Sequence, residues 1–233
     1  AARTGFDTAR IALGGDHLGP NPWTSLDADA AMDKAEVMVA AYVAAGFRAW
    51  GLGYRWFALL TIVAGNIAAL LAGTIINVAI PDIMGAFGIS QTEAQWLSTA
   101  NLAAATVAML ASSWMVRVLG LRQTVNLTTY LLLAGSLLGG LATNTELMII
   151  ARIMQGITAG VLTPVSTMLI FQVFLPGRQG VAIGITSVGN ILAPAIGPAI
   201  GGVLIDTFNW RYVFYAGVPF SVLTLTASFV FMP

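Results

Sequence analysis

The sequence Trp56-Phe-Ala-Leu-Leu-Thr-Ile-Val-Ala-Gly-Asn-Ile-Ala-Ala-Leu-Leu-Ala-Gly-Thr-Ile-Ile-Asn-Val-Ala-Ile80 contains no charged residue. A helix needs about 20 mostly apolar residues to cross the hydrocarbon core of a bilayer, so this stretch is long enough to span a membrane. Five further apolar stretches follow it along the chain, at 94–116, 123–142, 147–175, 179–205 and 212–232. The interiors of all six stretches hold one formal charge, that of Arg152. The sequence therefore predicts an all-α membrane protein with six transmembrane helices.

The composition of the chain agrees with a membrane protein. Hydrophobic residues make up 58% of the sequence and charged residues 9%, and the mean hydropathy is +0.84, whereas soluble domains carry about 25% charged residues. The absence of cysteine excludes disulfides and thiolate metal ligands. The sequence contains no Walker loop, nucleophile elbow or His-Glu-x-x-His motif. We therefore expect no enzyme activity, no cofactor and no metal site, and the lack of a basic cluster argues against a nucleic-acid partner.

The distribution of basic residues predicts the orientation of the helices. If the first helix starts in the cytoplasm, the outer loops hold Arg211 and the inner loops hold most other basic residues near the membrane. These inner-loop residues are Arg48, Arg55, Arg117, Arg122 and Arg178. Because cytoplasmic loops are enriched in arginine and lysine, we expect an integral protein of the bacterial inner (plasma) membrane with both termini in the cytoplasm.

The first 50 residues lack the long apolar stretches of the rest of the chain. They are typical of one βα unit, with a short strand and a Gly/Pro loop at 10–23 and an amphipathic helix at 27–45. The run Leu13-Gly-Gly-Asp-His-Leu-Gly-Pro-Asn-Pro-Trp23, followed by Tyr42-Val-Ala-Ala-Gly-Phe47, resembles the tagatose-bisphosphate aldolase accessory-subunit family. The resemblance implies a piece of a (β/α)₈ barrel, which needs about 250 residues to close. We therefore expect a fragment at 1–50 that does not fold independently and a transmembrane region at 51–233.

Four segments of the transmembrane region carry a second resemblance. They are Thr74-Ile-Ile-Asn-Val-Ala-Ile-Pro81, Arg152-Ile-Met-Gln-Gly-Ile-Thr-Ala-Gly-Val-Leu-Thr-Pro164, Ala193-Pro-Ala-Ile-Gly-Pro-Ala-Ile-Gly-Gly202 and Asn209-Trp-Arg-Tyr-Val-Phe-Tyr-Ala-Gly-Val-Pro219. In order and spacing they resemble the major facilitator superfamily, in particular its drug/proton antiporter branch of fourteen-span multidrug exporters. The resemblance covers residues 55–233 and corresponds to the amino-terminal six-helix half of such a transporter. It implies export of small amphiphilic molecules by alternating access, with proton coupling as one option.

Arg152 is the leading candidate for a functional residue. Gln155 and Gly156 lie three and four positions after it and share its helix face, which Gly160 and Pro164 extend. A guanidinium near the middle of the bilayer costs about 2.5 to 3.5 kcal/mol even on the lenient insertion scale, so it should face a cavity or a partner. The alternative is that the side chain snorkels to the outer membrane interface.

The amides within the spans could line a substrate or proton path together with Arg152 and Gln155. They are Asn66, Asn77, Asn101 and Asn190. Hydrogen bonding between helices is the alternative role, at about 0.6 to 1.7 kcal/mol for each bond. We expect Arg152 to hold a polar group of the first span, with Asn77 or Asn66 as the first choice. A backbone carbonyl, water or a group of an absent second half are the other options.

The fifth span carries small residues and prolines at helical spacing. Gly189, Ala193, Gly197 and Gly201 recur every fourth residue, and Pro194, Pro198 and Gly202 form an adjacent stripe. Small residues let a neighbouring helix approach closely, while proline removes a backbone hydrogen bond and bends the helix. The pattern predicts a closely packed, bent hinge. A packing face that does not move is the alternative.

Two positions depart from the exporter pattern. Ala72 stands where the branch usually has an acidic residue, and Arg117 with Val118 stands where the loop after the second span usually has aspartate. No aspartate or glutamate lies inside any of the six spans. Coupling to protons would therefore come from a missing second half, from Arg152 indirectly, or be absent.

The sequence also predicts the partners of the chain. They are the lipid bilayer, a small amphiphilic substrate, and either a second transporter half or a second copy of this chain. A half-transporter by itself is expected to be incomplete, because transport in this class depends on two halves that move against each other. The competing interpretations are a membrane fragment or fusion product that transports nothing, and a remnant of a sugar-phosphate aldolase subunit.

Overall fold

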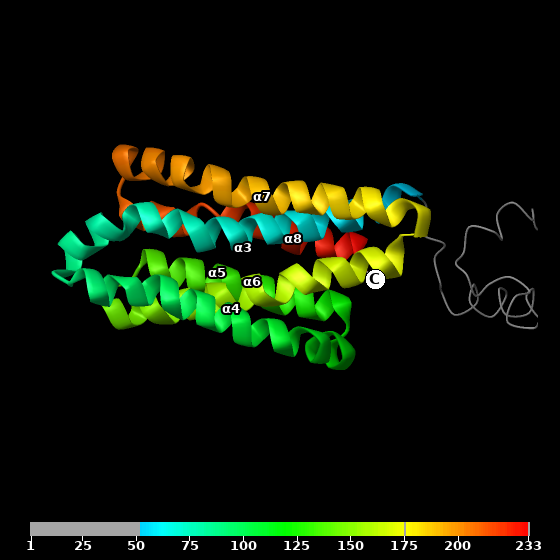
Figure 1. The fold of residues 1–233 in the computed structure, drawn as a ribbon, viewed down its shortest axis with the longest axis horizontal. Coiled ribbons are helices and arrows are strands. Elements are labelled where there is room, and N and C mark those ends of the chain that lie inside the picture. The colour runs from blue at the N-terminus through cyan, green and yellow to red at the C-terminus, as the bar shows by residue number, and fades with distance from the viewer. Residues whose placement is uncertain (1–51, 175, 233) are drawn as a thin grey trace, which may run out of the picture. The chain divides into compact units, whose positions relative to one another are not determined.

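Six long helices run side by side in the part of the chain described by the computed structural model, residues 52–174 and 176–232 (Figure 1). They are α3 (Leu52–Phe87), α4 (Gln91–Leu119), α5 (Leu121–Gly140), α6 (Thr145–Val173), α7 (Pro176–Thr207) and α8 (Val218–Phe231). A short 3₁₀ helix, η2 (Trp210–Tyr215), precedes α8. The described residues contain no strand. The βα unit expected at 1–50 lies outside them.

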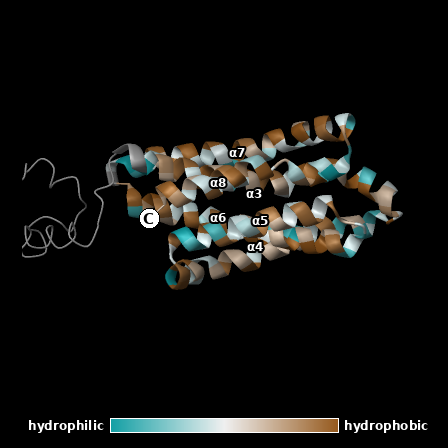
Figure 2. Cartoon of the chain, turned by 180° about the vertical axis from the view of Figure 1, so that it is seen from behind, coloured by the Kyte–Doolittle hydropathy of each residue, from teal (hydrophilic) through white to brown (hydrophobic). Residues whose placement is uncertain are grey.

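The six helices confirm the number and order of the predicted spans. Five segments are long and apolar enough to cross a membrane, with η2 and α8 counted together as 210–231. Figure 2 shows hydrophobic residues along the whole length of the bundle. The remaining helix, α5, has 20 residues, and its buried face carries the hydroxyl residues Thr124, Thr128, Thr129 and Ser136. Together with Arg122, Gln123 and Asn126 near its start, these hydroxyls lower the hydropathy of α5, and the hydroxyls themselves face the other helices.

The first helix, α3, is the most enclosed of these segments. In its most apolar stretch 72% of the residues are buried, against 11% for α4 and 22% for α7. Hydrogen bonds join α3 to two neighbours: Asn66 Nδ2 donates to Ser166 Oγ of α6 at 2.9 Å, and Thr224 Oγ1 of α8 donates to the carbonyl oxygen of Thr61 at 3.3 Å. The near-continuous apolar sequence of α3 therefore reflects burial on several sides.

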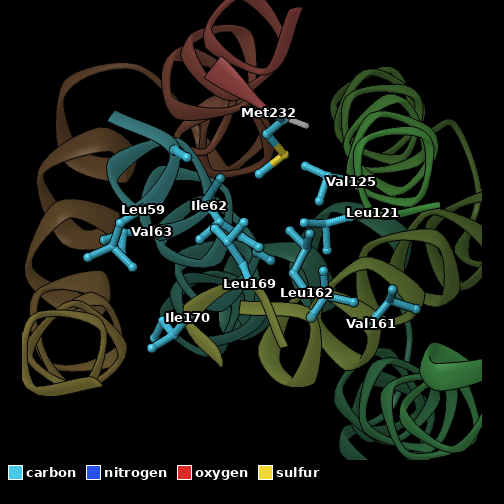
Figure 3. Close-up of a cluster of buried hydrophobic side chains, with 14 of the residues drawn as sticks. Leu59, Ile62, Val63, Leu121, Val125, Val161, Leu162, Leu169, Ile170 and Met232 are labelled. Atoms are coloured by element: carbon cyan, nitrogen blue, oxygen red, sulfur yellow. The ribbon is translucent and has the colours of Figure 1, made fainter. Parts of the chain in front are cut away.

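The apolar core has two parts, separated along the helices. The first part, shown in Figure 3, includes Leu59, Ile62, Val125, Leu162 and Leu169 from α3, α5 and α6. The second part includes Ile76, Ile83, Leu97, Met148 and Phe214. On α6 the partly buried residues of the two parts stop at Ile149 and resume at Ile157. Arg152 and Gln155 lie within this gap, so a polar layer separates the two apolar clusters.

Glycines of α6 bring its backbone directly against that of α4. A Cβ atom added at Gly156 would collide with the carbonyl oxygen of Asn101, and one added at Gly160 would collide with that of Ala105. On the other side of α6, a Cβ at Gly135 of α5 would lie 3.0 Å from the carbonyl oxygen of Ala151. Any side chain at Gly156 or Gly160 would therefore push α4 away from α6.

The glycine stripe of α7 packs on α3. A Cβ at Gly197 would lie 2.7 Å from Thr74 Oγ1, and one at Gly201 would lie 2.9 Å from Ile75 Cγ1. Gly189 faces α3 in the same way. The predicted close packing of this stripe is therefore present in the structure.

The adjacent stripe of α7 behaves differently. A Cβ at Gly202 would have open space around it, and Pro198 is exposed. The helix continues through Pro194 and Pro198, as α6 does through Pro164. The hinge function of these prolines stays a prediction.

Arginine side chains form hydrogen bonds that link each end of α5 to another element. At its start, Arg122 Nη2 donates to the carbonyl oxygen of Phe229 in α8 at 3.0 Å. After its end, Arg211 Nη1 donates to the carbonyl oxygens of Gly140 and Ala142 at 3.2 and 2.7 Å. The Arg211 guanidinium also lies 4.4 Å from the ring centre of Trp210. Carbonyls that a helix end leaves without an internal donor are satisfied in this way.

The backbone contact between α4 and α6 makes a direct prediction about stability. Gly160→Ala should destabilise the purified chain by about 1 to 3 kcal/mol, because the added methyl group must displace backbone atoms of α4. Gly184→Ala is the matched control, since its Cβ would meet open space and alanine is the better helix former by about 1 kcal/mol. Thermal unfolding in detergent measures both variants. Equal melting temperatures would contradict the close approach of α4 and α6.

Candidate functional site

Arg152 lies inside the bundle. Its side chain is 1% exposed and is the largest of the fully buried side chains in the described residues. The expectation that it faces the interior is therefore correct, and the alternative of snorkelling to the outer interface is wrong. Burial of a charge requires that its donors be satisfied by nearby oxygens.

The guanidinium of Arg152 donates hydrogen bonds to neutral oxygen atoms of three helices. Nη1 donates to the carbonyl oxygen of Ala72 at 2.6 Å, and Nη2 donates to that of Gly73 at 3.1 Å, both on α3. Nε donates to the carbonyl oxygen of Leu97 on α4 at 3.2 Å. Nη1 also donates to Oε1 of Gln155, one turn further along α6, at 2.7 Å. Four charge-assisted hydrogen bonds thus replace the water that a surface arginine would have.

The choice of Asn77 or Asn66 as the partner on the first span was wrong. Both amides have other partners: Asn66 Nδ2 donates to Ser166 Oγ, and Asn77 Oδ1 accepts from Ser98 Oγ at 3.1 Å. The backbone is available because Ala72 and Gly73 carry little or no side chain to cover it. A helical carbonyl oxygen has a second lone pair, so it can accept from Arg152 while it keeps its helix bond.

Two side-chain amides extend the arginine contacts. Gln155 Nε2 donates to Ser136 Oγ of α5 at 3.3 Å, and Asn101 Nδ2 of α4 donates to the carbonyl oxygen of Arg152 at 2.9 Å. The structure thus brings together Arg152, Gln155 and Asn101 among the predicted path residues. We call Arg152, Gln155, Asn101 and Ser136 the arginine network. It connects α3, α4, α5 and α6 within the polar layer.

Two more of the predicted path residues lie elsewhere on α3. Asn77 is exposed and pairs with α4, whereas Asn66 is buried and pairs with α6. Asn66 Oδ1 has no hydrogen-bond partner, and the same holds for Asn190 Oδ1 on α7. Buried polar atoms without a partner are rare in folded proteins and need an explanation.

Sequence reasoning missed several members of this arrangement. Ser136 and Ser166 were not singled out, because a serine inside an apolar span is common and gives only a weak signal. The carbonyls of Ala72, Gly73 and Leu97 have no signal at all in the residue types, apart from the small size of the first two. In the described residues, no group of three or more histidine, cysteine, aspartate or glutamate side chains could hold a metal ion.

Arg117, which stands where the exporter pattern usually has aspartate, forms a hydrogen bond within its own helix. Arg117 is exposed, and its Nε donates to the carbonyl oxygen of Ser113 on its own helix at 3.4 Å. This bond stays within α4, so it ties no second helix to the loop. Ala72, the other position that departs from the exporter pattern, contacts Arg152 directly, because its carbonyl oxygen accepts a hydrogen bond from the guanidinium.

Comparisons with known proteins agree with this helical arrangement. The similar curated proteins include the "Uncharacterized MFS-type transporter YhcA" of Bacillus subtilis, 33% identical over 73% of this chain and 32% of its own length. They also include the "Probable multidrug resistance protein EmrY" of Escherichia coli, 31% identical over 75% of this chain and 34% of its own length. The chain therefore spans about a third of the length of these relatives.

A solved structure shares the fold. The structure of the MFS proton:xylose symporter XylE, bound to 6-bromo-6-deoxy-D-glucose, superposes with a TM-score of 0.67 and 16% identity over 76% of this chain and 44% of its own. Residues 1–53 match the family described as D-tagatose-1,6-bisphosphate aldolase subunit GatZ/KbaZ-like. Residues 62–233 match the Major Facilitator Superfamily, and with this match covering most of its length the chain belongs to that superfamily.

Proposed function

We propose that residues 55–233 form the amino-terminal half of an exporter that moves amphiphilic small molecules across the membrane by alternating access. The arginine network is the observation that carries this proposal. A bundle that only needed to be stable would gain nothing from a buried charge, because replacing buried ionic groups by well-packed apolar side chains is often neutral or stabilising. The multidrug-resistance name of the Escherichia coli relative supports an amphiphilic substrate.

The network suits a half that moves as a unit. Alternating access is largely a rocking of one bundle against the other around a fixed site. Such motion requires that each bundle keep its own helices in register. Arg152 contacts α3 and α4 at once, and Gln155 extends the connection to α5. Breaking these contacts one by one inside a membrane would expose a charge, so the four helices favour a single arrangement.

Proton coupling has no carboxylate at the centre of this half. The aspartates and glutamates of the described residues are Asp82, Glu93, Glu146 and Asp206, all near helix ends or in loops. The guanidinium of an arginine has no acidic proton of the kind that carboxylate carriers bind and release near neutral pH. We therefore assign any proton-binding group to a second half and assign Arg152 a role in holding the helices.

A water-accessible path beside the network distinguishes a transporter half from an inert bundle. The chain has no cysteine, so Asn77→Cys gives a unique label site on the exposed side of α3. We expect a water-soluble maleimide to react at position 77 in lipid vesicles, and an excess of amphiphile to slow the reaction. Val203→Cys is the control, because Val203 is 65% exposed on an apolar part of α7. Reaction of both variants with lipid-soluble reagents alone would contradict the path.

The chain by itself should insert but not export. Both termini are expected on the cytoplasmic side, and a transport site between two halves is incomplete in one of them. We expect purified chain in liposomes to show no uptake or release of fluorescent amphiphiles above protein-free liposomes. Chemical cross-linking in the same liposomes reports the oligomeric state. Export together with a cross-linked dimer would show that a second copy replaces the missing half.

The planar fork of Arg152 is required in addition to its charge. Arg152→Lys keeps the charge but cannot reach Leu97, Ala72 and Gly73 together, so it leaves a buried charge with fewer acceptors and should destabilise the chain by about 3 kcal/mol. Urea or thermal unfolding in detergent measures the loss. Arg122→Lys is the comparison at a single carbonyl contact, and it should cost less. Unchanged stability of Arg152→Lys would contradict the proposed role of the network.

A further inference from the structure

Two buried amide oxygens of α3 and α7 have no hydrogen-bond partner in the described residues. Asn66 is 1% exposed, and both its Oδ1 and the Oδ1 of Asn190 are shielded from solvent. Neither atom takes part in the arginine network. An acceptor in this state loses its bonds to water and gains none from protein, which costs about 1 to 3 kcal/mol. Each such atom therefore calls for a donor from outside the described residues, such as water or a ligand.

The hydrogen bonds around Asn66 fix which way its amide points. Ser166 Oγ donates its hydroxyl proton within its own helix, to the carbonyl oxygen of Thr163 at 2.6 Å or that of Leu162 at 3.1 Å. The Ser166 oxygen can therefore only accept from Asn66, so the NH₂ group of Asn66 must face it at 2.9 Å. The Asn66 oxygen consequently points away from α6 and remains free to accept.

Asn190 lies at the same depth as Asn66. A Cβ at Gly189, the residue before Asn190, would lie 3.1 Å from Val63 Cγ1 and 3.7 Å from Ile67 Cδ1, and these two residues flank Asn66 on α3. Asn190 is four positions after the buried Thr186 and three before the buried Ala193, so it shares their inward side of α7. The contact of Gly189 with Val63 and Ile67 thus places Asn190 on the segment of α7 that packs on α3 beside Asn66.

We propose that Asn66 and Asn190 form a binding site for the N–H or O–H donors of an uncharged amphiphile. Both atoms are acceptors, so the site selects donors. Val63 and Ile67 provide apolar surface beside the two amides, which suits the rest of an amphiphile. No carboxylate of the described residues lies near this depth, and the nearest buried charge on α6 is the cation Arg152. A neutral donor is therefore favoured over an ammonium group.

This inference rests on the proposed export function, because it names the substrate class for the same half-transporter. N-phenyl-1-naphthylamine is a suitable probe, since it is an uncharged fluorescent amphiphile with one N–H group. Its N-methyl derivative has the same rings and lacks the donor. Titration of purified chain in lipid nanodiscs, corrected with protein-free nanodiscs, measures binding of each probe. We expect the N–H probe to bind about tenfold more tightly, the effect of one hydrogen bond to an otherwise unsatisfied acceptor.

Variants assign the difference to the two amides. Asn66→Leu and Asn190→Leu keep the side-chain size but remove the acceptor, so the tenfold preference should fall toward onefold in each. Asn126→Leu is the matched control, because Asn126 lies on α5 outside the proposed path and its oxygen already accepts from Ser228 Oγ, and it should keep the preference. Thermal unfolding checks that each variant is folded. If Asn66→Leu fails to fold, Asn190→Leu and the two probes on the unaltered chain still decide the outcome.

The results separate this inference from the proposed function. Equal binding of both probes to the unaltered chain would overturn the site, as expected if only water bonds the two oxygens. A preference that survives both leucine variants would overturn it too, because the probe would then bind elsewhere. Export is tested independently in liposomes that contain a complete transporter assembled with this chain. Preference for the N–H probe without its export would support the site and contradict the export function. Export of both probes at equal rates would support the export function and contradict the site.

Discussion

A single buried arginine sets the arrangement of the bundle. Arg152 cannot leave the interior without exposing a guanidinium to lipid, and the interior offers it only neutral oxygens. The geometry of those oxygens therefore fixes where α3 and α4 lie against α6. The two apolar clusters on either side supply burial, but apolar contacts are non-directional and allow helices to slide or rotate. Directional bonds in the polar layer remove that freedom.

The small residues of the bundle and its arginine depend on each other. Gly156 lets the backbone of α4 approach α6 so closely that Asn101 can bond the carbonyl of Arg152. Ala72 and Gly73 leave the backbone of α3 open to the guanidinium. In membranes, where apolar surfaces gain little by meeting one another, close backbone contact and hydrogen bonding are the main sources of helix association. In this protein, close backbone contact and hydrogen bonding between helices both occur in the polar layer around Arg152.

The helices could be predicted from the sequence, whereas the partners of Arg152 could not. Length and charge patterning located all six helices, because the bilayer sets a minimum length and penalises charge. The interior position of Arg152 followed from the same penalty. The hydrogen-bond partners of Arg152 could not be predicted, because every residue type carries the same backbone carbonyl. Which carbonyls the guanidinium reaches depends on how the helices cross. The hydroxyl-rich face of α5 can likewise be understood only from its neighbours, and only the packing of Gly189 on α3 places the segment of Asn190 beside that of Asn66.

Three of the four acceptors of Arg152 belong to the backbone, and this has a consequence for how the site can change over time. A backbone oxygen survives any exchange of its own side chain, so no particular residue at positions 72, 73 or 97 is needed to preserve the bond. The restriction falls on volume instead, because a bulky side chain at position 72 or 73 would cover the oxygen that the guanidinium uses. Related chains should therefore keep the arginine beside varied but compact neighbours, and statistical covariation between paired positions would not reveal its partners.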